Sequence, residues 1–194
     1  MTERERMLAG ELYDCGDPEL MEMWNAGKNL MRRYNLTDYS DREEQMRILD
    51  GLLGARGENT QITAPFYIDY GKLIHLGNNC EINMNCVFLD CNTITIGDNA
   101  LIGPGVHIYT VFHPVRAEER FHTHSSSGGF PFAVSRTAPV TIGENVWIGG
   151  GSIIMPGVRI GDNVTIGAGS VVTKPVPDHV VAYGNPCRVV RPIQ

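Results

Sequence analysis

Six histidines are the side chains best suited to move a proton near neutral pH. An imidazole with its ordinary pKa of about 6.5 can accept a proton and return it, as a general base for a hydroxyl nucleophile requires. His113 stands directly before Pro114, which stiffens the chain, at the point where a regular repeat first breaks off. This position favours His113. We expect the others at strand faces, turns or the surface: His75, His107, His122, His124 and His179.

Composition narrows the class of protein. The net charge of -6 provides no basic field for nucleic acid, and no stretch approaches the ~20 apolar residues of a membrane span. The charged start lacks the apolar core of a signal peptide. The five cysteines are odd in number and contain no C-x-x-C pair, which argues against a disulfide framework or a zinc finger. We therefore expect a cytoplasmic protein without nucleic-acid or membrane partners.

The first part of the chain has helical signals. Thr2 with Glu5 and Ser40 with Glu43 have the spacing of a capping box. Asp17-Pro18 combines an N-cap residue with proline at the first helical position. Apolar residues recur at helical spacing after Asp17-Pro18 and again after Ser40. This pattern predicts two or three short helices.

A six-residue repeat then replaces the helical pattern. Its aliphatic positions occur in two registers separated by a two-residue slip: Leu76, Ile82, Phe88, then Ile96, Ile102, Ile108, and later Ile142, Ile148, Ile154, Ile160, Ile166, Val172. One inward aliphatic residue in every six is typical of short strands joined by sharp corners, with three sides per coil. Ile142 and Ile160 should therefore stack one coil apart. The fold class predicted is mainly β, a parallel β-helix.

The repeat is interrupted once, by a long loop at 109–139 that contains His113 near its start and a Ser/Gly run at 125–129. A long excursion from a compact solenoid is usually functional or disordered. We therefore expect two parts, an N-terminal helical cap over 1–58 and a hexapeptide-repeat β-helix domain over 59–194.

Several motifs together resemble the maltose and galactoside O-acetyltransferases, a family of hexapeptide-repeat acyltransferases. They are Gly103-Pro104-Gly105-Val106-His107-Ile108-Tyr109-Thr110, His113-Pro114, Asn145-Val146-Trp147-Ile148-Gly149-Gly150, Val172-Thr173-Lys174 and Gly184-Asn185-Pro186. Met7-Leu8-Ala9-Gly10-Glu11-Leu12-Tyr13 and Asp69-Tyr70-Gly71 are closer to the maltose type. The resemblance implies a left-handed β-helix, a homotrimer with sites between subunits, acetyl-CoA as cosubstrate, a maltose- or glucose-like acceptor and no required metal.

The resemblance also implies roles for individual residues. His113 would be the general base and Asn83 a polar group near the reacting centre, although asparagine is also common at β-helix corners. Five residues are candidates to bind the sugar: Asp69, Tyr70, Asp90 and, from the cap, Asp14 or Asp17, between which the resemblance does not choose. For Asp90 the alternative is a capped turn.

The family's CoA-binding positions correspond to residues in the later repeats and at the C-terminal end: Trp147, Gly150, Ala168, Thr173, Lys174, Arg188 and Arg191. Cations there would pair with phosphates, while a solvated tail is the alternative for the two arginines. Two departures limit the transfer of roles. Cys91 replaces a second aspartate of the galactoside type, and the loop after His113 is longer than in the family.

Two other classes fit the repeats. A γ-carbonic-anhydrase-like metalloenzyme shares this fold and could use His113, His122 and His124 as ligands. A non-enzymatic β-helix scaffold, its cap binding a partner, is the third.

Overall fold

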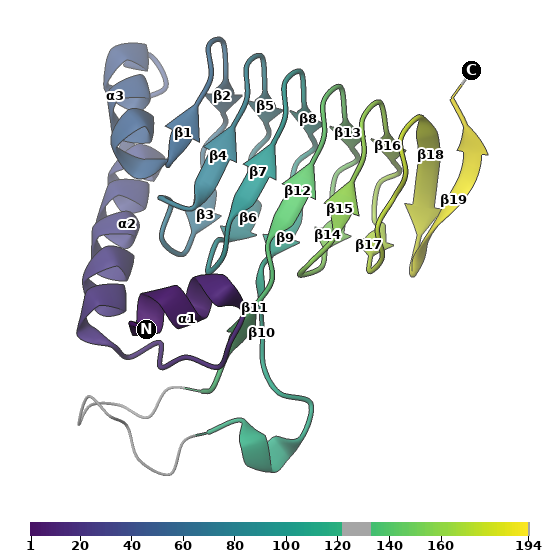
Figure 1. The fold of residues 1–194 in the computed structure, drawn as a ribbon. Coiled ribbons are helices and arrows are strands. Elements are labelled where there is room, and N and C mark those ends of the chain that lie inside the picture. Colours follow the sequence, from purple (N-terminus) through teal and green to yellow (C-terminus); the bar gives the residue numbers. More distant parts are fainter. Residues whose placement is uncertain (122–132, 194) are drawn as a thin grey trace.

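A computed structural model describes residues 1–121 and 133–193, which form a three-sided column of short parallel strands with helices packed at its N-terminal end (Figure 1). The helices are α1 (Glu3–Ala9), α2 (Pro18–Leu36) and α3 (Arg42–Leu52). Thr2 caps α1 in the predicted capping box, and Asp17 caps α2 with Pro18 at its first position. No helix in the described parts is long and apolar enough to cross a membrane.

The capping box predicted at Ser40 and Glu43 is wrong. Helix α3 is capped by Asp41, whose side chain accepts from the backbone N–H of Glu44 at 3.1 Å. The Ser40 hydroxyl instead donates to the Asp38 carboxylate at 2.7 Å. Short polar side chains can bond to several nearby backbone and side-chain partners. Here Ser40 bonds within the turn before α3 and does not cap the helix.

The strands of the column form three sheets, named face 1, face 2 and face 3 in the order in which the chain first visits them. Face 1 contains β1 (Ala55–Arg56), β4 (Ile74–Leu76), β7 (Ile94–Ile96), β12 (Val140–Ile142) and β15 (Arg159–Ile160). Face 2 contains β2 (Gln61–Ile62), β5 (Glu81–Ile82), β8 (Leu101–Ile102), β13 (Trp147–Ile148), β16 (Thr165–Ile166) and the terminal antiparallel pair β18 (Val180–Gly184) and β19 (Cys187–Pro192). Face 3 contains β3 (Phe66–Ile68), β6 (Cys86–Leu89), β9 (His107–Tyr109), β14 (Ile153–Ile154) and β17 (Val171–Val172).

The register follows the repeat. Ile142 pairs with Ile160 in the parallel ladder between β12 and β15, which confirms the predicted stacking. The repeat aliphatics are buried while their strand neighbours point outward, so the core is a column of stacked aliphatic side chains. The predicted fold class is confirmed.

Each corner between faces has its own chemistry. At the corner from face 1 to face 2, five asparagines adopt left-handed φ values: Asn59, Asn79, Asn99, Asn145 and Asn163. The side-chain amides of the first four bond from coil to coil at 3.0–3.2 Å. Asparagine tolerates this conformation better than most residues. The ladder therefore closes the column along this edge.

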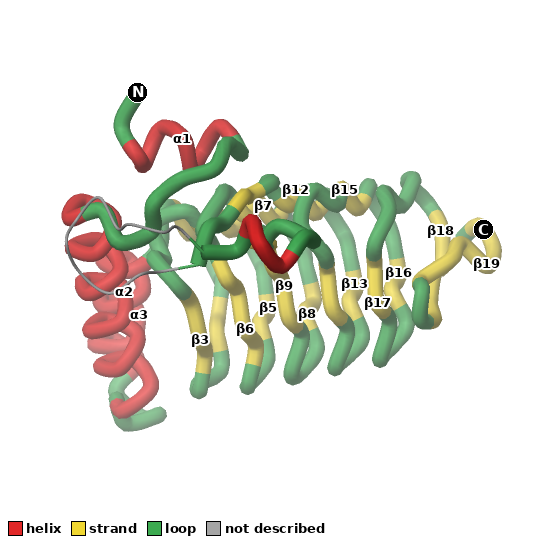
Figure 2. Tube along the Cα trace, turned by 90° about the horizontal axis from the view of Figure 1, so that it is seen from below, coloured by secondary structure: helices red, strands yellow, loops and turns green. Residues whose placement is uncertain are grey.

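The corner from face 3 to face 1, hereafter corner 3–1, is enlarged in three successive coils. Ile68 to Leu76 and Phe88 to Ile96 each span eight positions where the regular repeat spans six. In the next coil the chain leaves the column after β9, and the described parts of this excursion are 109–121 and 133–139 (Figure 2). Its base is an antiparallel pair, β10 (Val111–Phe112) with β11 (Arg136–Thr137), and it includes the 3₁₀ turn η1 (Ala117–Glu119). Because all three coils are enlarged at corner 3–1, their additional residues lie close to one another.

Candidate active site

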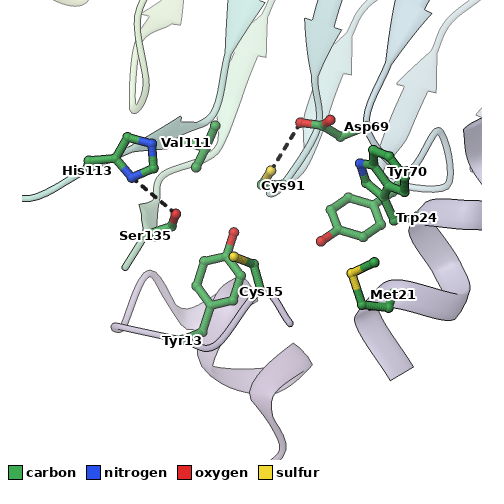
Figure 3. A pocket seen from close by; sticks show the side chains of 10 residues that line it. All are labelled: Tyr13, Cys15, Met21, Trp24, Asp69, Tyr70, Cys91, Val111, His113 and Ser135. Carbon is green, nitrogen blue, oxygen red and sulfur yellow. Dashed lines mark hydrogen bonds between the residues drawn. The ribbon is translucent and has the colours of Figure 1, made fainter. Parts of the chain in front are cut away.

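A cavity of about 290 Å³ lies between the helical cap and corner 3–1 (Figure 3). The cap provides the segment before α2 and the first turns of α2, while the enlarged corner provides the opposite wall. Ten residues line the cavity: Tyr13, Cys15, Met21, Trp24, Asp69, Tyr70, Cys91, Val111, His113 and Ser135. The lining is mostly aromatic, aliphatic and sulfur-containing, so the few polar groups in it determine which chemistry is possible.

His113 follows directly after β10 and has its tautomer fixed by the backbone. Its Nδ1 lies 2.9 Å from the carbonyl oxygen of Val134, and the Ser135 hydroxyl lies 3.4 Å from the same nitrogen. A carbonyl oxygen can only accept, so Nδ1 carries the proton and donates it. Nε2 therefore keeps its lone pair. This is the arrangement that a general base needs.

Asp69 is the carboxylate in the cavity lining. Its Oδ1 lies 3.1 Å from the Nζ of Lys28 on α2, and its Oδ2 accepts from the Cys91 thiol at 3.4 Å. Burial, followed by the charge of Asp69, raises the pKa of Cys91 well above its usual range. Burial likewise raises the pKa of Tyr70 and Tyr13. The thiol and both phenols are therefore neutral at physiological pH.

Asp90 lies behind the cavity wall and does not line it. Its side chain is fully buried, with Oδ1 accepting from the N–H groups of Asp69 and Tyr70 at 3.0 and 2.9 Å, and Oδ2 from Leu73 at 3.3 Å. Burial raises the pKa of Asp90 to about 7, against the lowering effect of these N–H donors. In this chain Asp90 holds the corner that presents Asp69 and Tyr70, which corresponds to the capped turn considered from sequence.

The cap is anchored to the same corner by Asn92. Its side-chain amide donates to the carbonyl of Leu8 at 3.1 Å and to the Thr137 hydroxyl at 2.9 Å. Gly10 ends α1 with φ +75, and a Cβ there would lie 2.8 Å from the Thr137 carbonyl oxygen. Only glycine combines that conformation with such close contact. Tyr13, which forms a bridge with Ser135, is thereby held at the cavity.

Neither Asp14 nor Asp17 is among the cavity-lining residues. The Asp14 carboxylate accepts from the N–H of Gly16 at 2.8 Å, and Asp17 caps α2 through the N–H of Glu19. Tyr13 and Cys15, the two neighbours of Asp14, point to the cavity instead (Figure 3). This segment thus brings a ring and a thiol to the site.

Asn83 lies at a different corner from His113. It follows β5 at the corner from face 2 to face 3, hereafter corner 2–3, and its Oδ1 accepts from the N–H of Met84. The four residues of β6 separate this corner from corner 3–1, a distance of roughly 10 Å or more at the rise of a strand. Within one chain Asn83 and His113 therefore do not meet.

Gly150 and Ala168 lie at the same corner as Asn83, in later coils. The backbones of adjacent coils are in close contact there: a Cβ at Gly103 would lie 2.5 Å from the nitrogen of Gly150, and a Cβ at Gly149 would lie 2.5 Å from the nitrogen of Ala168. In this row the left-handed positions are held by glycine in three successive coils: Gly105, Gly151 and Gly169, with φ from +66 to +70. A Cβ at any of the three would contact nothing within 4 Å. Asparagine serves this conformation at the face 1–face 2 corner, so packing does not require glycine here. Gly105, Gly151 and Gly169 thus form a row without side chains along corner 2–3, hereafter the glycine track.

The remaining predicted CoA residues flank this track or lie beyond it. Trp147 is on the outward side of β13 next to corner 2–3, with 55% of its surface exposed. Thr173 and Lys174 follow β17 at corner 3–1, and Arg188 and Arg191 lie on β19 of the terminal hairpin. The three cations thus belong to the last coil and the hairpin that follows it.

Sequence reasoning missed most of the cavity lining. Met21 and Trp24 have helical spacing typical of a packed helix face, yet both lie at the cavity. Periodicity marks the buried side of a helix without distinguishing core from cavity. The two-residue slip after Phe88 was the available signal for Cys91, because it marks the enlarged corner. His122 and His124 lie outside the described residues. No group of three potential metal-ligating side chains occurs within the described part of the chain.

A hexapeptide-repeat β-helix with a helical cap at its N-terminal end is the architecture of the hexapeptide-repeat acyltransferases. A model of the maltose acetyltransferase hexapeptide capping motif matches residues 6–57, and a model of the bacterial transferase hexapeptide (six repeats) matches residues 139–174. The chain belongs to the maltose/galactoside O-acetyltransferase family.

Similar proteins match along the whole length. The galactoside O-acetyltransferase of Escherichia coli (strain K12) is 42% identical, over 100% of this chain and 90% of that protein. A maltose O-acetyltransferase structure from Clostridium difficile 630 has a TM-score of 0.91 at 45% identity, covering 100% and 98% of the two chains. A galactoside acetyltransferase structure in complex with coenzyme A has a TM-score of 0.90 at 41% identity, covering 100% and 92%.

Proposed function

We propose that the protein transfers the acetyl group of acetyl-CoA to a hydroxyl of a maltose- or glucose-like sugar, with His113 as general base. The observation that carries this proposal is the hydrogen bond from His113 Nδ1 to the Val134 carbonyl, which leaves Nε2 as the proton acceptor at the cavity. The acceptor hydroxyl would donate its proton to Nε2 while its oxygen attacks the thioester carbon. Collapse of the tetrahedral intermediate breaks the C–S bond, and the departing thiolate takes the proton from the imidazolium.

Acetyl-CoA is the acyl donor; of the similar structures, a galactoside acetyltransferase is in complex with coenzyme A and a hexapeptide-repeat acetyltransferase from Vibrio cholerae is in complex with acetyl-CoA. The glycine track along corner 2–3 fits the pantetheine arm, because a side chain at Gly105, Gly151 or Gly169 would project into its path. We assign the flanking contacts to Trp147, Gly150 and Ala168, and a contact from corner 3–1 of the facing subunit to Thr173. Lys174, Arg188 and Arg191 supply cations for the phosphates.

A neighbouring subunit would complete the site, because Asn83 and the glycine track lie across face 3 from His113. Face 3 has an outward row that is apolar except for His107 and suits burial between copies: Tyr67, Val87, His107, Ile153 and Val171. We therefore propose a homotrimer in which His113 of one subunit faces corner 2–3 of the next. Asn83 would then stabilise the negative oxygen of the intermediate or orient the thioester.

The acceptor would lie in the cavity against the rings of Tyr70 and Trp24. The Asp69 carboxylate still has lone pairs for sugar hydroxyls, since a carboxylate offers about four acceptor positions. Asp90 acts through the backbone of Asp69 and Tyr70. Asp14 and Asp17 act by fixing the segment that carries Tyr13. We further propose the division into a cap over 1–58 and a transferase domain over 59–194, and a cytoplasmic location, where the five free cysteines stay reduced.

Replacing the proposed base tests the mechanism. The variant His113→Ala should lower acetyl transfer by about 10²–10⁴-fold, the usual effect of a general base, while coenzyme A still binds. Thiol release from acetyl-CoA would be followed with glucose, maltose and other hydroxyl acceptors, and coenzyme A binding by calorimetry. His179→Asn is the matched control, because asparagine occupies the equivalent corner in the preceding coils. A near wild-type rate in His113→Ala would remove His113 from the role.

A further inference from the structure

We propose that Lys28 makes the acceptor cavity electrically neutral, so that the enzyme selects an uncharged polyol over an amino sugar or a sugar phosphate. This inference rests on the proposed function and specifies the acceptor class. Lys28 is not itself in the cavity lining. It acts from behind the lining, through Asp69 and Trp24, and is therefore a positioning and specificity residue.

Lys28 joins helix α2 to the corner that carries Asp69. Its Nζ lies 3.1 Å from Asp69 Oδ1, donates to the carbonyl of Ile68, and lies 5.0 Å from the centre of the Trp24 ring. The Lys28 and Asp69 side chains are only 27% and 18% exposed. A partly buried pair keeps more of its interaction than a surface pair. One ammonium group thus orients the carboxylate and the ring that face the acceptor.

Apart from thiols and phenols, the lining holds one carboxyl group, that of Asp69, and one imidazole, that of His113. Burial raises the pKa of the thiols and phenols in the lining, and the other side chains do not ionise. His113 must be neutral to act as base. The Asp69 charge is already balanced by Lys28. An ammonium or phosphate on the acceptor would therefore be desolvated without a counter-charge, which is costly, whereas hydroxyls can use the free lone pairs of Asp69.

The test is a charge cycle on two residues. The acceptors are glucose, glucosamine and glucose 6-phosphate at pH 7, and the measured product is the alkali-labile O-acetyl ester, which excludes acetylation of the amine. Lys28→Met leaves Asp69 unbalanced and should raise the ratio of kcat/KM for glucosamine to that for glucose by about five- to tenfold. Asp69→Asn should change this ratio in the opposite direction and favour the phosphate.

Two further variants separate charge from structure. The double variant Lys28→Met/Asp69→Asn restores neutrality and should bring the ratio back to the wild-type value, because the two sites are coupled. Lys28→Arg keeps the charge and should keep the ratio. Lys72→Met is the matched control, since Lys72 donates to the carbonyl of Leu53 and is not among the cavity-lining residues.

The outcomes separate this inference from the proposed function. If wild-type enzyme prefers glucose and the cycle behaves as described, the inference holds. If Lys28→Met changes kcat/KM equally for all acceptors, it is overturned. If the wild-type enzyme acetylates none of the three acceptors, the proposed function fails. The inference is then tested by measuring how tightly each acceptor binds. Trp24 fluorescence in a Trp147→Phe background reports acceptor binding, because the chain has two tryptophans. If the ratio of the affinities for glucose and glucosamine is the same with Lys28 present and in Lys28→Met, the inference is overturned.

Discussion

Pairing two inactive subunits tests whether the active site is shared. His113→Ala removes the proposed base at corner 3–1, and Asn83→Ala removes the polar group at corner 2–3, across face 3 in the same chain. If one site uses His113 of one subunit and Asn83 of the next, each homotrimer is inactive. A mixed trimer still contains one intact pair.

The size of the recovery follows from cyclic symmetry. In a three-membered ring with both variants present, whether two to one or one to two, the chain with intact His113 precedes the chain with intact Asn83 once. Mixed trimers should therefore regain about one third of wild-type kcat per site, whatever the mixing ratio. The background should remain at about 1% or less, because each single change costs about 10²-fold or more.

The assay needs two affinity tags. Co-expression of the variants followed by purification on both tags removes homotrimers, and thiol release from acetyl-CoA is then measured with saturating acceptor. A doubly mutated chain paired with wild type should also keep only the site between two intact partners, which makes it a second control. Mixed trimers that stay at background, with each variant folded, would refute a shared site. An active Asn83→Ala homotrimer would remove Asn83 from the reaction.

Two further predictions concern the cosubstrate track and the buried carboxylate. Gly151→Asn should raise the KM for acetyl-CoA about tenfold or more. Its Tm should change little, because asparagine tolerates the left-handed φ and a Cβ at this position has no atom within 4 Å. Asn163→Gly, the converse change at the corner from face 1 to face 2, should leave the KM for acetyl-CoA unchanged. Asp90→Asn should lower Tm, and by less at pH 8 than at pH 5. Because the pKa of Asp90 is raised to about 7 in the folded state, wild-type stability falls as pH rises between the unfolded and folded pKa values; a penalty that grows with pH would show that the N–H donors outweigh burial.

The sequence predicts the column well because one physical requirement repeats. Ile142, Ile160 and their equivalents must each be buried by the coils on either side, so an error at one position is corrected by the others. The position of His113 at the enlarged corner is also predictable, because the residue stands where the six-residue repeat is interrupted. The same logic locates Asp69 and Cys91 at an enlarged corner once the eight-residue intervals are recognised as belonging to one edge.

The cap contributions could not be predicted in the same way. Trp24 and Lys28 are separated from Asp69 by a long stretch of chain, and helical periodicity says only which side of α2 faces inward. Their meeting depends on how α2 docks. Gly27 is part of that docking, since a Cβ there would lie 2.4 Å from the Tyr70 carbonyl oxygen. Close approach of two backbones is a tertiary property, and a single glycine in a helix does not identify its partner.

Asp90, Cys91 and Asn92 show how corner 3–1 can carry a functional site without changing the core of the column. Asp90 accepts the backbone N–H groups that hold the cavity wall, Cys91 lines the cavity, and Asn92 binds the cap. All three lie in the extra length of one corner, outside the aliphatic repeat, so they can change without disturbing the stacking of the core. Their neighbours one coil away are close because parallel strands stack at about 4.8 Å. A change of acceptor therefore requires substitutions at one corner and the facing cap, while the glycine track on the next corner keeps its geometry. For this reason we expect acceptor preference and acetyl-CoA affinity to respond to separate sets of variants.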